Sequence, residues 1–344
     1  MTEAPPDLSP REAVQRWLDR QRVDKRDATV SAYWYRLKHF VEWAETEEID
    51  TVRDLSGWVL ESYETHRRAA GLEAITLNNE LGTLQQFLDY CARVELVDDD
   101  LPEKVDVPSV PAQDQVSETR LDATSAERLL SHYRGGGHGT GRRGHAFLEL
   151  AWFTAARVGA LRGLDLDDID LDRGYVRFRH RPQSETPLKN GPKGERTVTI
   201  PPEVTDVVER YLGDRHDVVD DYGRHPLFTT NRGRAGLTTL REDCYFATVP
   251  CRHRDCPHGK EPSSCDWFHH RAASKCPSSR SPHQVRTGSI TWHRTREVPV
   301  EIVSERANAS PEVIRRHYDQ PDTDERIERQ APYLSNLRFS HNNS

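Results

Sequence analysis

Three short segments in the second half of the chain contain side chains suited to chemistry on a phosphodiester. They are TAARVGALRGLDLDDID (154–170), SPHQVRTG (281–288) and SERANASPEVIRRHYD (304–319). Arg157 and Arg286 can neutralise the non-bridging oxygens of a phosphate, because a guanidinium keeps its charge and donates in a fixed fork. Tyr318 supplies a hydroxyl nucleophile, and His283 titrates close enough to neutral pH to move a proton. This set predicts phosphoryl transfer through a tyrosine ester without a divalent metal.

The order and spacing of these residues indicate function more strongly than any single residue does, because an isolated Arg, His or Tyr usually has a structural role. The order is Arg157, a basic residue in a turn-rich segment, then His283-x-x-Arg286 and finally Tyr318. It resembles the order found in the tyrosine recombinase (phage integrase) family, and the resemblance covers essentially the whole chain. The resemblance implies binding to double-stranded DNA, site-specific cleavage and rejoining through a 3'-phosphotyrosine, no cofactor for catalysis, and a tetramer on DNA.

The basic residue of the turn-rich segment LKNGPKGE (188–195) has two candidates. Lys189 matches a family pattern of Lys, a small residue and Gly before the second strand. Lys193 matches a different spacing, counted back from Pro201. We favour Lys189, which the resemblance implies would protonate the departing 5' oxygen.

Two positions depart from the family pattern. Ala160 stands where an acidic residue is common, so a supporting salt bridge is expected to be absent or supplied by a neighbour. Asn308, in RANASP, aligns with the His or Trp of the family's leucine-glycine-histidine box. Asn can still donate a hydrogen bond to a phosphate oxygen, so Asn308 is included in the candidate site.

Two other functions are compatible with this set of residues. The departure at Asn308 is compatible with a catalytically silent, recombinase-derived DNA-binding protein. A type IB topoisomerase-like enzyme uses a similar set of Arg, Lys, Arg and Tyr. The small size of the chain and its helical N-terminal region favour the recombinase.

A cysteine-rich segment at about 250–280 precedes His283. Clustered cysteines in a cytoplasmic chain favour a structural zinc site over disulfides, although these spacings are longer than usual. Two pairs of reduced cysteines are the alternative. A zinc site would present Arg252, Arg254, Lys260 and Arg271 to the DNA backbone. The four candidate ligands are Cys251, Cys256, Cys265 and Cys276.

The elements that must position these residues form two domains. Four stretches of residues 1–97 have apolar residues at helical spacing, which predicts a helical bundle; the resemblance implies a core-binding (SAM-like) DNA-binding domain. Its first helix is expected to begin at the capping box Ser9–Glu12 and its fourth at Thr76. Residues 98–117 are rich in Pro and charge and are expected to form an extended linker. Residues 118–344 are the expected catalytic domain.

The catalytic domain is predicted to be mostly helical, with strands at 174–181 and 196–200 forming one small sheet. Turn residues at 190–194 indicate that these two strands form a hairpin. The predicted fold class is therefore mainly α with a small β-sheet: a helical bundle plus a mixed α+β tyrosine-recombinase catalytic domain.

The charge balance is acidic, with a formal net charge of -8, which is unusual for a chain that binds DNA. Lysine is scarce and Asp is frequent, as in DLDDIDLD (165–172), which we interpret as a solvated surface adapted to high salt. The segment 251–296, by contrast, contains nine basic and three acidic residues and is expected to face DNA. The chain has neither a long apolar run nor a secretory signal pattern, so a cytoplasmic protein is expected.

Overall fold

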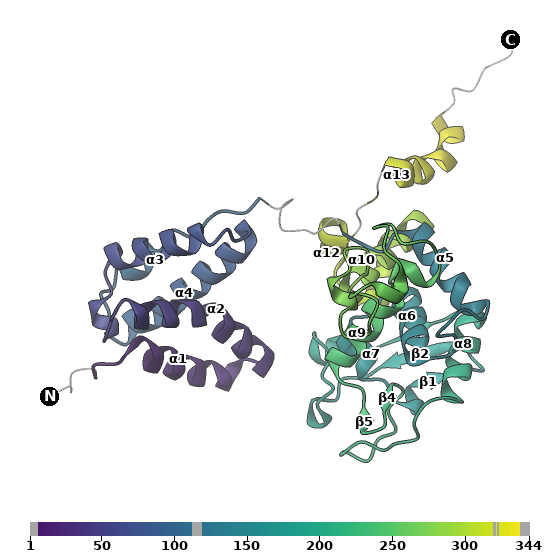
Figure 1. The fold of residues 1–344 in the computed structure, drawn as a ribbon, viewed down its shortest axis with the longest axis horizontal. Coiled ribbons are helices and arrows are strands. Elements are labelled where there is room, and N and C mark those ends of the chain that lie inside the picture. Colours follow the sequence, from purple (N-terminus) through teal and green to yellow (C-terminus); the bar gives the residue numbers. More distant parts are fainter. Residues whose placement is uncertain (1–5, 112–118, 319–320, 322, 338–344) are drawn as a thin grey trace, which may run out of the picture. The chain divides into compact units, whose positions relative to one another are not determined.

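The computed structural model describes residues 6–111, 119–318, 321 and 323–337 (Figure 1). The chain divides into two compact units, Met1–Ser117 and Glu118–Ser344. Within the described part, no helix combines the length and the apolar character that crossing a membrane requires.

The first unit is a bundle of four helices around an aromatic core. They are α1 (Pro10–Asp24), α2 (Asp27–Thr46), α3 (Gly57–Ala69) and α4 (Ala74–Arg93), with 3-10 turns at Val52–Asp54 and Leu101–Lys104. The rings of Phe40 and Tyr63, on α2 and α3, meet edge to face at 5.3 Å, and Trp17 of α1 meets Phe87 of α4 at 6.0 Å. Such pairs add to the stabilisation gained by burying large side chains. The predicted helical bundle is therefore confirmed.

The start of α1 follows the capping pattern in the sequence, and the start of α4 does not. The Ser9 hydroxyl accepts a hydrogen bond from the Glu12 amide, and the Glu12 carboxylate accepts one from the Ser9 amide at 3.0 Å, so the predicted capping box is confirmed. The fourth helix begins at Ala74, after Glu73, and the predicted start at Thr76 is wrong. The Thr76 amide already donates to the Glu73 carbonyl oxygen, which places Thr76 inside the first turn.

The segment predicted to be a linker, 98–117, is partly integrated into the first unit. Leu101 and Val105 are buried in the bundle core. The Asp106 amide donates a 2.8 Å hydrogen bond to the carboxylate of Glu64 on α3. The prediction of an extended linker is therefore wrong up to residue 110, because apolar residues four apart bury against α3 and α4 despite the prolines. Residues 112–117 lie outside the described part.

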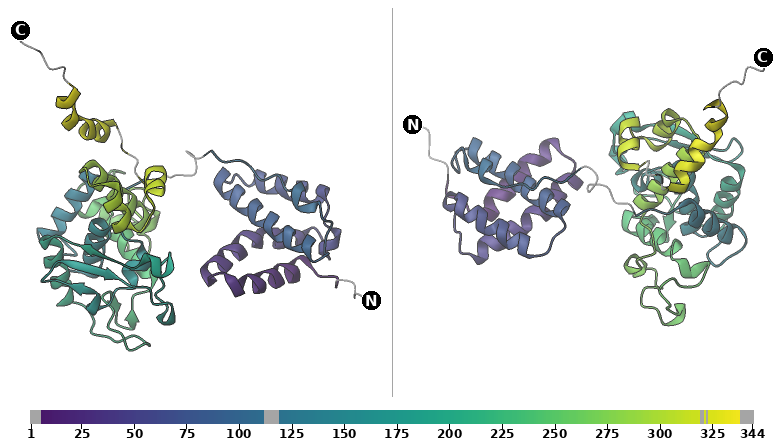
Figure 2. Two further views of the ribbon diagram at one scale, coloured as in Figure 1. Left: turned by 180° about the vertical axis from the view of Figure 1, so that it is seen from behind. Right: turned by 90° about the horizontal axis from the view of Figure 1, so that it is seen from above.

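In the second unit, helices pack against one face of a small sheet. Its helices are α5 (Ala123–Arg134), α6 (Arg143–Thr154), α7 (Val158–Arg162), α8 (Pro202–Leu212), α9 (Leu237–Ala247), α10 (Pro282–Thr295), α11 (Val300–Ala307), α12 (Pro311–Val313) and α13 (Thr323–Gln330). Its strands are β1 (Ile169–Asp170), β2 (Tyr175–Phe178), β3 (Arg196–Thr199), β4 (Thr229–Thr230) and β5 (Gly233–Arg234). Strands β1, β2 and β3 pair in that order, all antiparallel, with Val176 opposite Val198. In the left view of Figure 2 these strands lie in front of the helices.

The connection between β2 and β3 is longer than the predicted turn at 190–194. Two 3-10 turns, Pro182–Ser184 and Gly191–Gly194, lie within it. The strands still pair antiparallel, with Phe178 opposite Arg196, so the predicted hairpin is confirmed with a folded connection in place of a tight turn.

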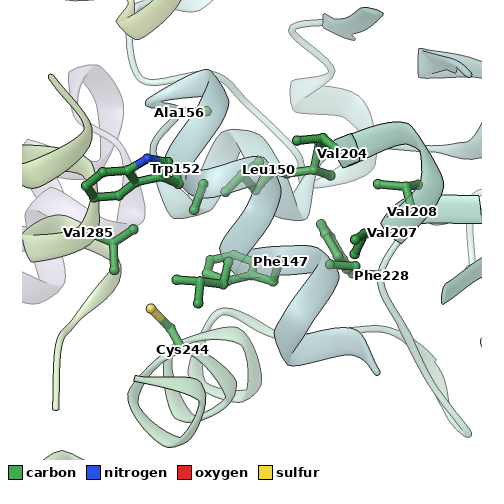
Figure 3. Close-up of a cluster of buried hydrophobic side chains, with 14 of the residues drawn as sticks. Phe147, Leu150, Trp152, Ala156, Val204, Val207, Val208, Phe228, Cys244 and Val285 are labelled. Atoms are coloured by element: carbon green, nitrogen blue, oxygen red, sulfur yellow. The ribbon is translucent and has the colours of Figure 1, made fainter. Parts of the chain in front are cut away.

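Helix α6 runs through the centre of the second unit. Its residues from His145 to Trp152 are all buried. Figure 3 shows Phe147 and Leu150 of this helix among apolar side chains from α8, α9 and α10. A helix enclosed on all sides is held rigidly, because interior packing is dense. The residues immediately after α6 are therefore well suited to carry a functional group.

The acidic stretch 165–172 is not a wholly solvated surface. Asp165 and Asp168 are buried. Asp165 pairs with Arg224 at 2.7 Å and with Arg234 at 2.6 Å. Asp165 and Asp168 are therefore not part of a solvated surface, because buried carboxylates need such partners; the interpretation of the Asp-rich composition as an adaptation to salt stays a hypothesis.

Candidate active site

Arg157 lies where the buried helix α6 ends and α7 begins. Helix α6 stops at Ala155, which has a left-handed conformation with φ of 52°. Arg157 then occupies the N-cap position of α7. Its half-buried guanidinium donates a 2.8 Å hydrogen bond to the carbonyl oxygen of Asn308. The core thus fixes the backbone of Arg157, and the contact with Asn308 fixes its side chain.

Arg286 lies in the second turn of α10 and has only 1% of its surface exposed. This helix begins with a capping box in which Ser281 and Gln284 exchange hydrogen bonds. The Arg286 guanidinium donates to the carbonyl oxygen of Ala307, at 2.7 Å, and to that of Ala155. Arg286 therefore connects the ends of α6 and α11, so the three segments singled out in the sequence meet at one place.

His283 stands one turn before Arg286 on α10, with an exposed side chain. The pKa of His283 is lowered, first because protein atoms replace water around part of the ring and then by the positive charges of Arg286, Arg157 and Lys189. The ring is therefore neutral at neutral pH and able to accept a proton. The charge of Lys189 acts on the His283 ring, and the choice of Lys189 over Lys193 stays a prediction.

Asn308 joins the β2–β3 connection to the arginines. It ends α11 in a left-handed conformation with φ of 50°, which Asn tolerates better than most residues. Its carbonyl oxygen accepts from Arg157, and its side-chain oxygen accepts a 3.0 Å hydrogen bond from the amide group of Asn190. A backbone carbonyl, rather than a carboxylate at position 160, thus supports Arg157.

The backbone of Tyr318 ends a π-helical turn, Ile314–Tyr318, directly after α12. Ile314 is fully buried in a small core that also contains Ala155 and Ile290. This anchors the start of the turn beside the residues that position the arginines. The side chain of Tyr318 lies outside the part of the chain that the structure describes.

Arg196, on strand β3, is a further arginine near Arg157 and Arg286 that the sequence analysis did not single out. Its guanidinium donates to two backbone carbonyl oxygens at 2.8 and 3.0 Å and stands 4.2 Å from the centre of the Phe178 ring. The pKa of Arg196 is lowered to about 9, first by burial and then by the charges of Arg286 and Arg157. Three arginines thus repel one another in a common region, which is the condition for strong binding of an anion.

The cysteine-rich segment folds into loops and short 3-10 turns between α9 and α10. Burial raises the pKa of the Cys251 thiol to about 11, and the neighbouring Cys256 thiol adds to the shift. The pKa of the Cys256 thiol is lowered, chiefly by the backbone amides of Lys260 and His258. Among the described residues, which include all of this segment, no three or more His, Cys, Asp or Glu side chains are grouped to hold a metal ion. The arrangement therefore gives the predicted four-cysteine site no direct support.

The basic side chains of this segment do not all face solvent. Arg254 and Lys260 are exposed, and the Lys260 ammonium lies 3.8 Å from the centre of the Trp267 ring. Arg252 instead lies 4.5 Å from the centre of the Phe246 ring and donates to the carbonyl oxygen of His138. The expectation that Arg252 is presented to DNA is therefore wrong, because its side chain folds back onto the protein.

Comparison with known proteins places this arrangement in a family. The model of the phage integrase family matches residues 119–318, and that of the phage integrase N-terminal SAM-like domain matches residues 14–95. Tyrosine recombinase XerD of Halalkalibacterium halodurans is 28% identical over 225 residues, which cover 64% of this chain and 71% of the relative. Tyrosine recombinase XerA of Thermococcus kodakarensis is 28% identical over 208 residues, which cover 60% of this chain and 62% of the relative.

A solved structure shows the same fold at low sequence identity. The Tn1549 transposon integrase, in complex with a circular intermediate DNA, aligns with a TM-score of 0.63 and 13% identity. The alignment covers 95% of this chain and all of that one. The two family models together span both units, and the catalytic match alone covers more than half of the chain and ends at Tyr318. The chain belongs to the phage integrase family.

Proposed function

We propose that this protein is a site-specific DNA recombinase that cuts and rejoins DNA through a 3'-phosphotyrosine at Tyr318. The observation that carries the proposal is the meeting of Arg157 and Arg286 beside His283, because it joins three distant segments into one positively charged site. A phosphodiester is the anion that this chemistry fits. The names of the relatives and the match to the family support the same reaction.

In the proposed cleavage step, the phenolic oxygen of Tyr318 attacks phosphorus and the bond from phosphorus to the 5' oxygen breaks. Arg157 and Arg286 would neutralise the non-bridging oxygens, where negative charge grows in the transition state. His283, held neutral by its lowered pKa, would accept the phenol proton. Lys189 would give a proton to the departing 5' oxygen. Attack by a 5' hydroxyl reverses these transfers and releases Tyr318, so no cofactor has to supply energy.

The proposed partner is double-stranded DNA, and we propose that several copies of the chain assemble on it in the cytoplasm, as a tetramer. The solved Tn1549 integrase was found in complex with DNA, which supports the partner. Strand exchange between two sites requires that two cleaved duplexes be held together, which supports self-association.

One experiment separates this function from its two rivals. The full chain is incubated with two duplexes that contain the same recognition sequence, and with a supercoiled plasmid. A recombinase is expected to exchange strands between the duplexes. A topoisomerase would relax the plasmid without exchange, and a silent DNA-binding protein would retain both substrates uncut; either result contradicts the proposal.

The side chain of Asn308 is expected to contribute one hydrogen bond to the phosphate. Asn308→Gly should slow cleavage by about one to two orders of magnitude, as for a transition-state donor worth ~2 kcal/mol. Gly is the informative replacement, because it keeps the left-handed backbone and the carbonyl that accepts from Arg157. Single-turnover cleavage of a labelled duplex measures the effect. If the Asn308→Gly variant cleaves DNA at the parental rate, then Asn308 contributes only its backbone carbonyl, which accepts from Arg157.

A structural zinc ion in the cysteine-rich segment remains a proposal. It is supported by the sequence alone, since four of the six cysteines fall within residues 251–276. Elemental analysis of protein purified without chelators should give about one zinc per chain, and Cys256→Ser should lower it. Cys91→Ala, which changes a buried cysteine of the first unit, is the control. A zinc content near zero in the parental protein would contradict the zinc proposal.

A further inference from the structure

The C-terminal end of α11 binds three arginine side chains that come from different parts of the second unit. The last carbonyl oxygens of a helix have no partner within it and lie at the negative end of the helix dipole. At the end of α11, three consecutive carbonyl oxygens, those of residues 306, 307 and 308, each accept a hydrogen bond from one guanidinium. The donors are, in that order, Arg196 at 2.8 Å, Arg286 at 2.7 Å and Arg157 at 2.8 Å. Arg196 is therefore bound to the same element as the two arginines of the candidate active site.

Arg196 also belongs to the part of the chain that carries Lys189. It is the first residue of β3, and its guanidinium donates a second hydrogen bond, at 3.0 Å, to the carbonyl oxygen of Gly194 in the β2–β3 connection. Gly194 lies so close to α11 that a Cβ atom there would come within 2.6 Å of the side-chain nitrogen of Asn308. One guanidinium thus joins the β2–β3 connection to the end of α11, where the two are in close contact.

The residues on either side of Lys189 are fixed as well. The Leu188 amide donates a 3.0 Å hydrogen bond to the ring of His180, at the end of β2. The Asn190 side chain donates one of the same length to the side chain of Asn308. The backbone of Lys189 is therefore held from both sides, while its side chain is exposed and can reach a substrate.

Stability alone does not explain a charged residue at position 196. Burial, together with the positive charges of Arg286 and Arg157, lowers the pKa of Arg196 to about 9, so these surroundings oppose its charge. Buried charged groups can often be replaced by apolar residues of similar size without loss of stability. The two hydrogen bonds that the guanidinium forms therefore point to a role in the geometry of the site.

We propose that Arg196 is a positioning residue for Lys189. By bonding to the carbonyl oxygens of Arg306 and Gly194, it holds the β2–β3 connection against the end of α11, which also binds the two active-site arginines. This contact sets the Lys189 ammonium at the 5' oxygen of the phosphate that those arginines bind. The inference rests on the proposed function, in which the bond from phosphorus to the 5' oxygen breaks and this oxygen takes a proton from Lys189.

A duplex in which sulfur replaces the bridging 5' oxygen at the cleavage site tests this role. A thiol is far more acidic than an alcohol, so the sulfur leaves as a thiolate and needs no proton from an acid. Single-turnover cleavage is measured on this sulfur duplex and on the ordinary duplex. Arg196→Met is expected to slow cleavage of the ordinary duplex by about one to two orders of magnitude, and that of the sulfur duplex by less than about threefold. Lys189→Ala should likewise be slow on the ordinary duplex alone.

Arg177→Met is the matched control. Arg177 lies on the neighbouring strand β2 and contacts Tyr175 of its own strand, with a 3.2 Å hydrogen bond to the Tyr175 hydroxyl. This variant should cleave both duplexes at close to the parental rate. Arg286→Lys gives the opposite comparison, because it impairs phosphate binding and should stay slow on both duplexes.

A second variant, Arg196→Lys, keeps the test valid if Arg196→Met disturbs the fold. It retains one charged donor for the Arg306 carbonyl oxygen, so its defect should be smaller and should also disappear on the sulfur duplex. Equal defects on both duplexes would overturn the proposal, as would parental rates of both variants on the ordinary duplex. Slow cleavage of the sulfur duplex by Lys189→Ala would overturn it too. If the parental protein binds both duplexes and cleaves neither, the proposed function itself fails, and this inference fails with it.

Discussion

Replacing Arg286 with Lys should lower the rate of DNA cleavage by about three orders of magnitude, because an ammonium cannot reproduce two fixed donors in a transition state. Arg286 is buried, and its guanidinium also holds the carbonyl oxygens of Ala307 and Ala155. The loss should therefore appear in the single-turnover rate constant on a labelled duplex, with DNA affinity changed much less.

The matched control for Arg286→Lys is Arg294→Lys. Arg294 lies on the same helix and donates to the Val298 carbonyl oxygen. The Arg294→Lys variant is expected to cleave DNA at close to the parental rate. Melting curves of both variants show whether a lower rate comes from lost chemistry or from a disturbed fold. If the Arg286→Lys variant cleaves DNA at a rate within about tenfold of the parental rate, the match to the His-x-x-Arg box is accidental.

Tyr318→Phe should bind DNA with parental affinity and form no covalent adduct at all. The substitution removes the nucleophilic oxygen and leaves Arg157 and Arg286 in place to hold the phosphate. A gel shift measures binding, and a denaturing gel of labelled DNA measures the adduct. Tyr333→Phe is the control, because Tyr333 is an exposed tyrosine of the same C-terminal region. An adduct in Tyr318→Phe would show that another residue attacks the phosphate.

Much of the fold could be predicted from local patterns in the sequence. The capping box Ser9–Glu12 is a local pattern, and it is present at the start of α1. Where the outcome depended on tertiary packing, local patterns failed. Prolines and charges in 98–117 predicted a linker, yet the burial of Leu101 and Val105 outweighed them.

The candidate site was predictable only as far as its residues resemble the family. Arg157 and Arg286 could be found by their order and spacing, although their roles stay predictions. Arg196 could not, because an Arg on a short strand usually faces solvent, and only the packing of β3 against α11 brings it to the other two. Arg252 was misplaced for the same reason, since its contact with Phe246 depends on how the segment folds back.

Mass spectrometry of the protein–DNA adduct can identify the residue that attaches to DNA. The parental protein is incubated with a duplex whose nick beside the cleavage site releases the 5' fragment, so that the cleaved state cannot be resealed. The adduct is digested with protease, and the peptide bound to the nucleotide is sequenced by mass spectrometry. We expect a phosphotyrosine at Tyr318, joined to the 3' end of the DNA. Attachment at another residue such as Tyr333, or DNA cut with no protein attached, would contradict it.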